Sequence, residues 1–113
     1  MPPTDLAILR GTLDLLLLKA VSWGPMHGVD VVRWIEEVTD KRLQIEEGAL
    51  YPALHRLEER RWLIADWGYT TSGRRAKYYE LSALGRKQLG AEVTRWSQYA
   101  EAVRLVLAAD GAR

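Results

Sequence analysis

The sequence predicts a mostly α-helical domain with one small β-hairpin. Within residues 12–60 and again over residues 83–108, apolar side chains recur at spacings of three and four, the period of an amphipathic helix. Between these regions, β-branched and aromatic residues flank a Thr-Thr-Ser-Gly turn, as in a hairpin. The length of 113 residues suits one domain.

The first helix is expected over residues 12–21, in the segment GTLDLLLLKAV, with Gly24 and Pro25 as its stop signal. Its apolar side chains surround most of the helix, since Leu15 and Leu18 lie away from the main leucine stripe. A helix that is apolar on two sides needs two surfaces to cover it. We therefore expect one side to face the core and the other, with Leu15 and Leu18, to contact a second subunit.

The second helix is expected within residues 27–40, HGVDVVRWIEEVTD, where four apolar residues share one face and charged residues lie mostly on the other. His27 is expected to start or pack this helix. After it, residues 41–45 have room for a brief strand before the next helix.

The third helix is expected within EEGALYPALHRLEERRWL, residues 46–63, with leucines at helical spacing as its buried stripe. Pro52 is tolerated most easily in a first turn, so we expect the helix to begin near Gly48 or Ala49. One interpretation is a helix that docks on a ligand through its outer side; the alternative is a surface helix with Tyr51 packed on a neighbour. The candidate contacts on the outer side are Gly48, Ala49, Tyr51, Pro52, His55 and Arg56.

The hairpin is expected to pair residues 63–69 with residues 75–81. Gly73 is the candidate for the positive φ of the loop, with Gly68 as a second candidate. Three cations, Arg74, Arg75 and Lys77, stand at or just past the turn with no acid among them. Such a basic tip suits contacts to phosphate or to a minor groove, although solvated turn charges are common. Acids near both ends of the third helix count against DNA facing them: Glu46, Glu47, Glu58 and Glu59.

The last helix is expected over residues 83–108, capped by Ser82. Its apolar residues step by 4, 3, 4, 3 and 4, which is the seam of a helix packed against another helix. If that seam is a dimer interface, two copies of Trp96 approach near the twofold axis and form either a packed plug or the wall of a small-molecule pocket. The seam consists of Leu89, Val93, Trp96, Ala100, Val103 and Leu107.

Composition excludes several function classes. The chain has no cysteine and two histidines, which predicts neither a disulfide nor a metal site, and no catalytic grouping, phosphate-binding loop or cofactor motif stands out. The apolar run of residues 13–18 is too short to span a membrane, and we expect a cytoplasmic protein without a signal peptide. Core packing is the expected role of Trp23, Trp34 and Trp62. A net charge of +1 gives no general attraction to nucleic acid, so local clusters must provide it.

Helix, helix, helix, hairpin, helix is the element order of a winged helix-turn-helix domain. In that fold the third helix enters the major groove of double-stranded DNA and the hairpin, or wing, contacts the neighbouring backbone. The outer side of residues 46–63 and the basic hairpin tip are then parts of one surface.

The chain also resembles the PadR family of bacterial transcriptional regulators, through GTLDLLLLKAV, GPMHGVDVV, EEGALYPALHRLEERRWL and GRRAKYYELSALGRKQL. The resemblance covers about residues 9–107 and matches the shorter form of the family, with a single C-terminal helix. It implies a homodimer, usually a repressor of inverted-repeat operators, released by a small effector such as a phenolic acid or a drug. It implies that the first and last helices form the dimer surface, and it carries no effector residues over. The DNA contacts it implies are Gly48, Ala49, Tyr51, Pro52, His55, Arg74, Arg75, Lys77 and Tyr78.

We therefore expect a dimeric DNA-binding repressor that reads its operator through helix 47–60 and wing 68–78 and possesses no enzymatic activity. Trp96 is the candidate contact if a small aromatic effector releases the repressor. Residues 1–81 form the expected DNA-binding region and residues 82–113 the dimerisation helix, in one continuous domain. Two alternatives stay open: a winged-helix module that binds proteins but not DNA, and a helical drug-binding protein without a regulatory role.

Overall fold

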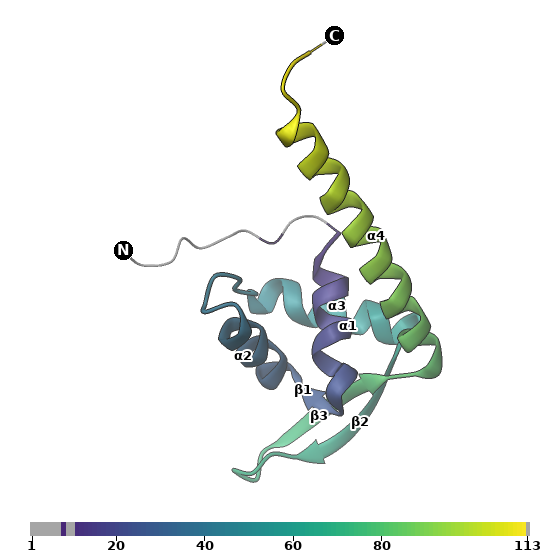
Figure 1. The fold of residues 1–113 in the computed structure, drawn as a ribbon. Helices are drawn as coiled ribbons and strands as arrows, with labels where there is room; N and C mark the ends of the chain where they lie inside the picture. The colour runs from purple at the N-terminus through teal and green to yellow at the C-terminus, as the bar shows by residue number, and fades with distance from the viewer. Residues whose placement is uncertain (1–7, 9–10, 113) are drawn as a thin grey trace.

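A computed structural model describes residue 8 and residues 11–112 (Figure 1). The helices and strands follow the predicted order, with one additional short strand before the second helix. The elements are α1 (Leu13–Ala20), η1 (Val21–Trp23), β1 (Met26–His27), α2 (Gly28–Val38), α3 (Glu47–Glu59), β2 (Leu63–Tyr69), β3 (Arg75–Leu81) and α4 (Ala83–Ala108).

The core lies where α1, α2 and α3 meet the root of the hairpin. The inward leucine stripe predicted for α3 is confirmed, because Leu50, Leu54 and Leu57 are all buried. Leu18 is 0% exposed within the single chain, so its predicted contact with a second subunit is wrong. It fills the chain's own core because α1 is surrounded there by α2, α3 and α4, whereas Leu15 stays half-buried.

A three-stranded antiparallel sheet in the order β1-β3-β2 supports the core from one side. Strand β1 was not predicted, because a pair of residues has no period to recognise; Met26 pairs with Tyr79 and His27 with Tyr78. The strand considered for residues 41–45 does not form, apart from a single bridge residue at Leu43. The chain turns there instead.

The hairpin strands have the predicted bounds, Leu63–Tyr69 and Arg75–Leu81. At the turn Gly73 adopts φ 86°, as expected, and its amide donates to the Thr70 carbonyl. Gly68 does not serve the turn. It lies inside β2, where a Cβ would come 3.2 Å from the Tyr78 ring, so its lack of a side chain makes room for that ring.

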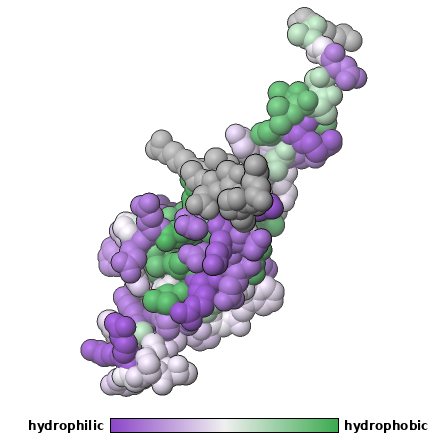
Figure 2. Space-filling model, turned by 90° about the vertical axis from the view of Figure 1, so that its left-hand side faces the viewer, coloured by the Kyte–Doolittle hydropathy of each residue, from purple (hydrophilic) through white to green (hydrophobic). Residues whose placement is uncertain are grey.

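The capping of α4 is confirmed: Ser82 Oγ accepts a hydrogen bond of 2.9 Å from the Gly85 amide. Its first turns pack on the body, whereas its second half extends away from it (Figure 1). Leu105, Val106 and Leu107 in that second half are exposed. Figure 2 shows apolar surface on the part of α4 that extends from the body. No helix in residues 11–112 is long and apolar enough to cross a membrane.

Two of the three tryptophans expected in the core are confirmed: Trp34 and Trp62 are partly buried against it. Trp23 is not, because it is 68% exposed at the end of η1, where Lys19 Nζ lies 4.6 Å from its ring centroid. The helical segment η1 ends at Trp23, with Gly24 as its cap, and the Trp23 side chain lies at the surface beyond the core.

Candidate nucleic-acid interface

The outer face of α3 brings together five of the six helix residues named from the sequence, all but Arg56. The buried residues of this helix point inward, and those between them on the helical circumference stay exposed. Nothing lies within 4 Å of a Cβ built on Gly48, so the helix start is unobstructed. The exposed face consists of Gly48, Ala49, Tyr51, Pro52 and His55.

Pro52 does not lie in the first turn, contrary to expectation. The helix begins at Glu47, as the range 47–60 predicts but before the start near Gly48 or Ala49 on which that expectation rested, and Pro52 is its sixth residue. A proline there has no N–H for the carbonyl four residues earlier, that of Gly48. The helix forms anyway because Leu50, Ala53, Leu54 and Leu57 bury its inner face.

Tyr51 lies across the start of α2, so the packing on a neighbour that was considered for it is present. A Cβ on Gly28 would meet the Tyr51 hydroxyl oxygen and Cε1 at 2.8 Å, so the ring packs directly on that glycine. Its side chain is still 44% exposed. Contact with α2 therefore orients Tyr51 without removing it from the surface.

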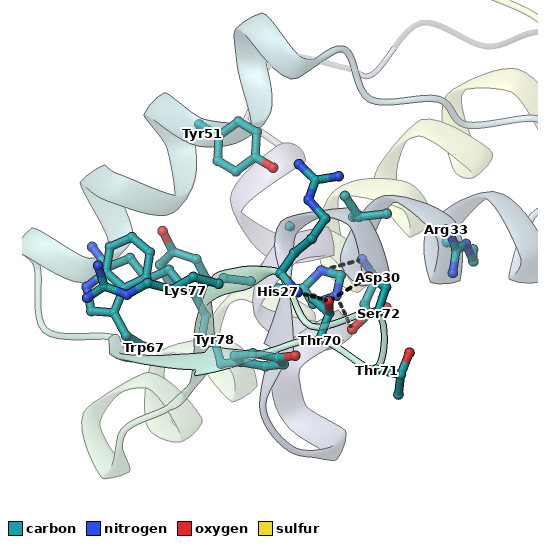
Figure 3. Close-up of a pocket in the computed structure, with 16 residues that line it drawn as sticks. His27, Asp30, Arg33, Tyr51, Trp67, Thr70, Thr71, Ser72, Lys77 and Tyr78 are labelled. Atoms are coloured by element: carbon teal, nitrogen blue, oxygen red, sulfur yellow. Dashed lines mark hydrogen bonds and ion pairs between the residues drawn. The ribbon is translucent and has the colours of Figure 1, made fainter.

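An open cleft of about 730 Å³ separates Tyr51 from the wing. One end of it is formed by the start of α2, where His27 caps the helix by accepting from the Asp30 amide, as the sequence suggested. Figure 3 shows Tyr51 on the α3 side of the cleft and Trp67 and Lys77 on the wing side. The outer face of α3 and the wing therefore border the same cleft.

Two wing arginines lie beside this cleft and are exposed. The Arg75 guanidinium carbon stands 4.4 Å from the centroid of the Trp67 ring, which lies diagonally across the hairpin. Arg74 is held at the turn by its amide, which donates to Thr70 Oγ1 at 3.2 Å. Neither arginine side chain has a carboxylate partner among the ion pairs found in residues 11–112. Both are free to meet an anion.

Lys77 is engaged within the chain. Its Nζ lies 2.8 Å from Glu58 Oε1, near the C-terminal end of α3. The three cations at the hairpin tip have no acid among them in the sequence, as expected. In the folded chain, however, α3 places Glu58 next to Lys77.

Tyr78 lies on the opposite face of the hairpin from Lys77, since successive strand residues alternate. Its hydroxyl donates to the Tyr69 carbonyl at 3.2 Å, and its ring packs edge-on against His27 at 5.3 Å. These contacts brace the hairpin against β1. Tyr78 still lines the same cleft as Tyr51, but its hydroxyl and ring are engaged within the chain.

The charged residues at the C-terminal end of α3 are mostly paired. His55 Nε2 lies 2.8 Å from Glu59 Oε1 on the exposed face. Arg56 binds Asp14 of α1, with Arg60 3.7 Å from the same carboxylate. Arg56 is thus held toward α1 and away from the wing.

The residues predicted for a subunit contact on α4 follow one side of the helix and remain largely uncovered. Leu89 and Ala100 are half-buried, whereas Val93, Trp96, Val103 and Leu107 are exposed. Tyr99 extends this surface, with its ring centroid 6.3 Å from that of Trp96.

Sequence reasoning missed Gly28, Trp67 and Tyr69 at the interface. The two aromatic residues were recognisable, because strand alternation and the hairpin register put them on the same face as Arg75 and Lys77. No sequence signal marks Gly28 as the seat of Tyr51. Within the described residues, no group of three or more His, Cys, Asp or Glu is placed to hold a metal ion.

Comparison with known proteins identifies the family. The sequence profile of the transcriptional regulator PadR-like family matches residues 17–91, more than half of the chain. The chain belongs to this family. PadR-like proteins are DNA-binding transcription regulators and not enzymes, so the exposed face of α3 and the wing are elements of a regulator.

Similar solved structures support the PadR-like fold. A PadR-like transcription factor from Bacteroides fragilis is 30% identical, with a TM-score of 0.70 over 85% of this chain and 90% of that one. A PadR family regulator from Eggerthella lenta is 29% identical, with a TM-score of 0.75 over 89% and 86%. A curated protein from Lysinibacillus sphaericus, named Uncharacterized protein X, is 30% identical over 88% of this chain and 92% of its own length.

Gly28→Ala is expected to weaken binding to a duplex selected from random sequences by about tenfold. The added methyl would displace the Tyr51 ring, while alanine is no worse than glycine for forming a helix. Fluorescence anisotropy measures the affinity, and a thermal melt checks that folding is kept.

The control for this prediction is the Tyr51→Ala background. Once the ring is absent, Gly28→Ala should cause no further loss, because the two substitutions act through one side chain. Losses that add in the double variant would contradict the coupling of Gly28 to Tyr51.

Proposed function

We propose that the chain is a dimeric repressor that binds an inverted-repeat operator through helix 47–60 and wing 68–78. The observation that carries the proposal is the exposed face of α3, which adjoins two unpaired wing arginines across an open cleft. Such a regulator acts in the cytoplasm, where bacterial chromosomal DNA lies.

In this proposal, α3 enters the major groove. Gly48 and Ala49 let the helix start approach base edges closely, and Pro52 stiffens the same segment. Tyr51 and His55 lie four residues apart and present polar atoms to bases or phosphates. Specificity would come from this face because it alone reaches the base edges.

The wing supplies charge to the complex. Arg74 and Arg75 neutralise phosphates beside the groove, and stacking on Trp67 holds the Arg75 guanidinium in place. Lys77 and Tyr78 hold the wing in position, Lys77 through its ion pair with Glu58 and Tyr78 through its hydrogen bond to the Tyr69 carbonyl.

Dimerisation through α4 and α1 would cover the apolar surface that a single chain leaves exposed. Residues 82–113 then form the dimerisation helix and residues 1–81 the DNA-binding region, of which residues 1–7, 9 and 10 lie outside the described residues. The proposed contacts are Leu15, Leu89, Val93, Trp96, Ala100, Val103 and Leu107.

Trp96 is the proposed effector contact at the twofold axis. Together with Tyr99 it offers aromatic surface to a flat apolar ligand. An aromatic compound that stabilises one arrangement of the dimer would change the spacing of the two α3 helices and release the operator. Titration of Trp fluorescence with phenolic acids, alongside operator binding, tests this step.

A protein-interaction module that does not bind DNA is the second candidate. The net charge of only +1 and the exposed acids Glu46 and Glu47 at the start of α3 favour it. Duplex binding that weakens linearly in log affinity against log salt supports the regulator, whereas absence of such binding favours the module.

The double substitution of Arg74 and Arg75 by Glu is expected to weaken all duplexes alike. It should lower the salt slope by roughly one unit for each lost phosphate contact, because wing cations release counterions without reading bases. Anisotropy titrations at several salt concentrations measure the slope for a selected and a random duplex.

A charge-matched control is available for the single variant Arg74→Glu. Arg95→Glu makes the same change on α4, where the side chain is exposed and paired with Glu92. It should leave the slope unaltered. An unchanged slope in the wing variants would mean that the wing points away from DNA.

A further inference from the structure

The wing and α3 are joined by one ion pair outside the core. Lys77 in the middle of β3 meets Glu58, the next-to-last residue of α3, with 2.8 Å between Nζ and Oε1. Each side chain is 31% exposed, so the pair lies at the edge of the interface and not in open solvent. It bridges 19 residues of sequence.

Neighbouring side chains fix the position of the lysine. Its Nζ lies 5.7 Å from the centroid of the Tyr79 ring, which belongs to the core. Trp67 pairs with Lys77 across the hairpin. The hydrogen bond to Glu58 raises the pKa of Lys77 and so stabilises the charged form of the lysine.

The pair lies at a point of the hairpin where it can limit the movement of the wing. Strand β2 leaves the end of α3 and β3 returns to α4, so the hairpin is anchored at its root and free at its tip (Figure 1). Lys77 lies between root and tip, and beyond it come Arg75 and the turn. A tie at this point limits the swing of the tip relative to α3.

We propose that the Lys77–Glu58 pair is a clasp that sets the angle between the wing and α3, and that Lys77 is a positioning residue and not a phosphate contact. This inference rests on the proposed function. It assigns the wing's phosphate contacts to Arg74 and Arg75 alone, and it gives Glu58 a favourable role in DNA binding although it is an acid beside the DNA-facing surface.

Electrostatics distinguish the clasp from direct phosphate binding. If Lys77 contacted a phosphate, Glu58 would compete for it and repel the same phosphate, so loss of the acid should tighten binding. In the clasp, loss of the acid frees the wing, and its ordering must then be achieved during binding. The two roles therefore predict opposite effects of Glu58→Gln.

The test compares Glu58→Gln, Lys77→Met and the double variant in titrations with a selected duplex at several salt concentrations. Each single variant should lose about tenfold in affinity, and the double variant should lose no more than either single one. The salt slope should match that of the wild type in all three. Melting temperatures should change little, because partly exposed pairs contribute little to folding.

Two further variants sharpen the comparison. Exchange of the charges, Lys77→Glu with Glu58→Lys, should restore most of the affinity, since either orientation closes the clasp. Glu59→Gln removes the neighbouring acid, which pairs with His55 and does not touch the wing. It should leave the affinity unchanged or raise it.

Binding by Glu58→Gln that equals or exceeds the wild type would overturn the clasp, as would a slope lowered by about one unit in Lys77→Met. In either case the proposed function would stand, provided that the wild type binds DNA with a salt slope. A wild-type chain without salt-dependent binding would refute the proposed function and the clasp together.

Discussion

Gly85→Ala is expected to destabilise the fold by at least about 3 kcal/mol, the upper range for overpacking. Gly85 is buried in the first turn of α4, and a Cβ there would come 2.0 Å from the Trp62 carbonyl oxygen. That oxygen accepts the Ser82 amide at 3.0 Å, so it belongs to the joint between the end of α3 and the start of α4. Relief of the clash requires moving backbone, because no flexible side-chain end can give way.

Urea denaturation at fixed protein concentration measures this loss, since dimer formation would couple stability to concentration. Gly90→Ala is the matched control in the same helix, because nothing lies within 4 Å of a Cβ at that position. It should stabilise by roughly 0.5 to 1 kcal/mol through helix propensity. A Gly85→Ala variant with the wild-type midpoint would contradict the close packing of α4 on Trp62.

The elements that were predicted well carry their signals locally. The hairpin bounds follow from the β-branched and aromatic residues of the strands and from the turn residues between them. The start of α4 follows from Ser82, whose hydroxyl oxygen accepts a hydrogen bond from the amide three residues later, that of Gly85. Strand β1 has no such signal, because it exists only as a partner for Tyr78 and Tyr79 of β3. Pro52 was misplaced for a related reason: the tertiary burial of the inner face of α3 outweighs a missing backbone donor.

The candidate site likewise contains residues with a local sequence signal and residues whose role depends on tertiary contacts. Helical periodicity separates the outer face of α3 from its leucines, so Gly48, Ala49 and Tyr51 were recognisable. The internal partners of Lys77 and Tyr78 were not, since Glu58 lies on another element and the Tyr69 carbonyl is reached only after the hairpin closes. A charged or aromatic residue on a wing is therefore assigned to DNA safely only when its folded partners are known.

The prediction for Leu18 was wrong because the two sides of the first helix are not equally covered by the chain. Both leucines lie off the main stripe, yet Leu18 is 0% exposed because it faces the core crowded by three other helices. Leu15 stays half-buried one turn earlier. Periodicity shows that a helix has apolar residues on two sides and needs a packing partner on both. The tertiary packing decides which of these residues face the core and which stay at the surface.

Val103→Asp is expected to abolish the dimer at micromolar concentration. Val103 is 40% exposed on the α4 surface that we propose to be the subunit contact. A carboxylate in that seam would be desolvated without a partner, which is costly for any association. Sedimentation velocity measures the change in mass, and thermal melting of the monomer checks that the winged-helix body stays folded.

Loss of the dimer should remove tight binding to the full inverted repeat. In a twofold dimer, two α3 helices would contact half-sites roughly 34 Å apart, and the second contact gains from the effective concentration that the first provides. Affinity for the full operator should therefore fall at least about 100-fold, toward that for a half-site, which should itself be unchanged. Gln98→Asp is the matched control, because it adds the same charge at an exposed position on the other side of α4. A Val103→Asp variant that remains dimeric with full operator affinity would place the subunit contact elsewhere, and the proposed Trp96 effector site would lose its basis with it.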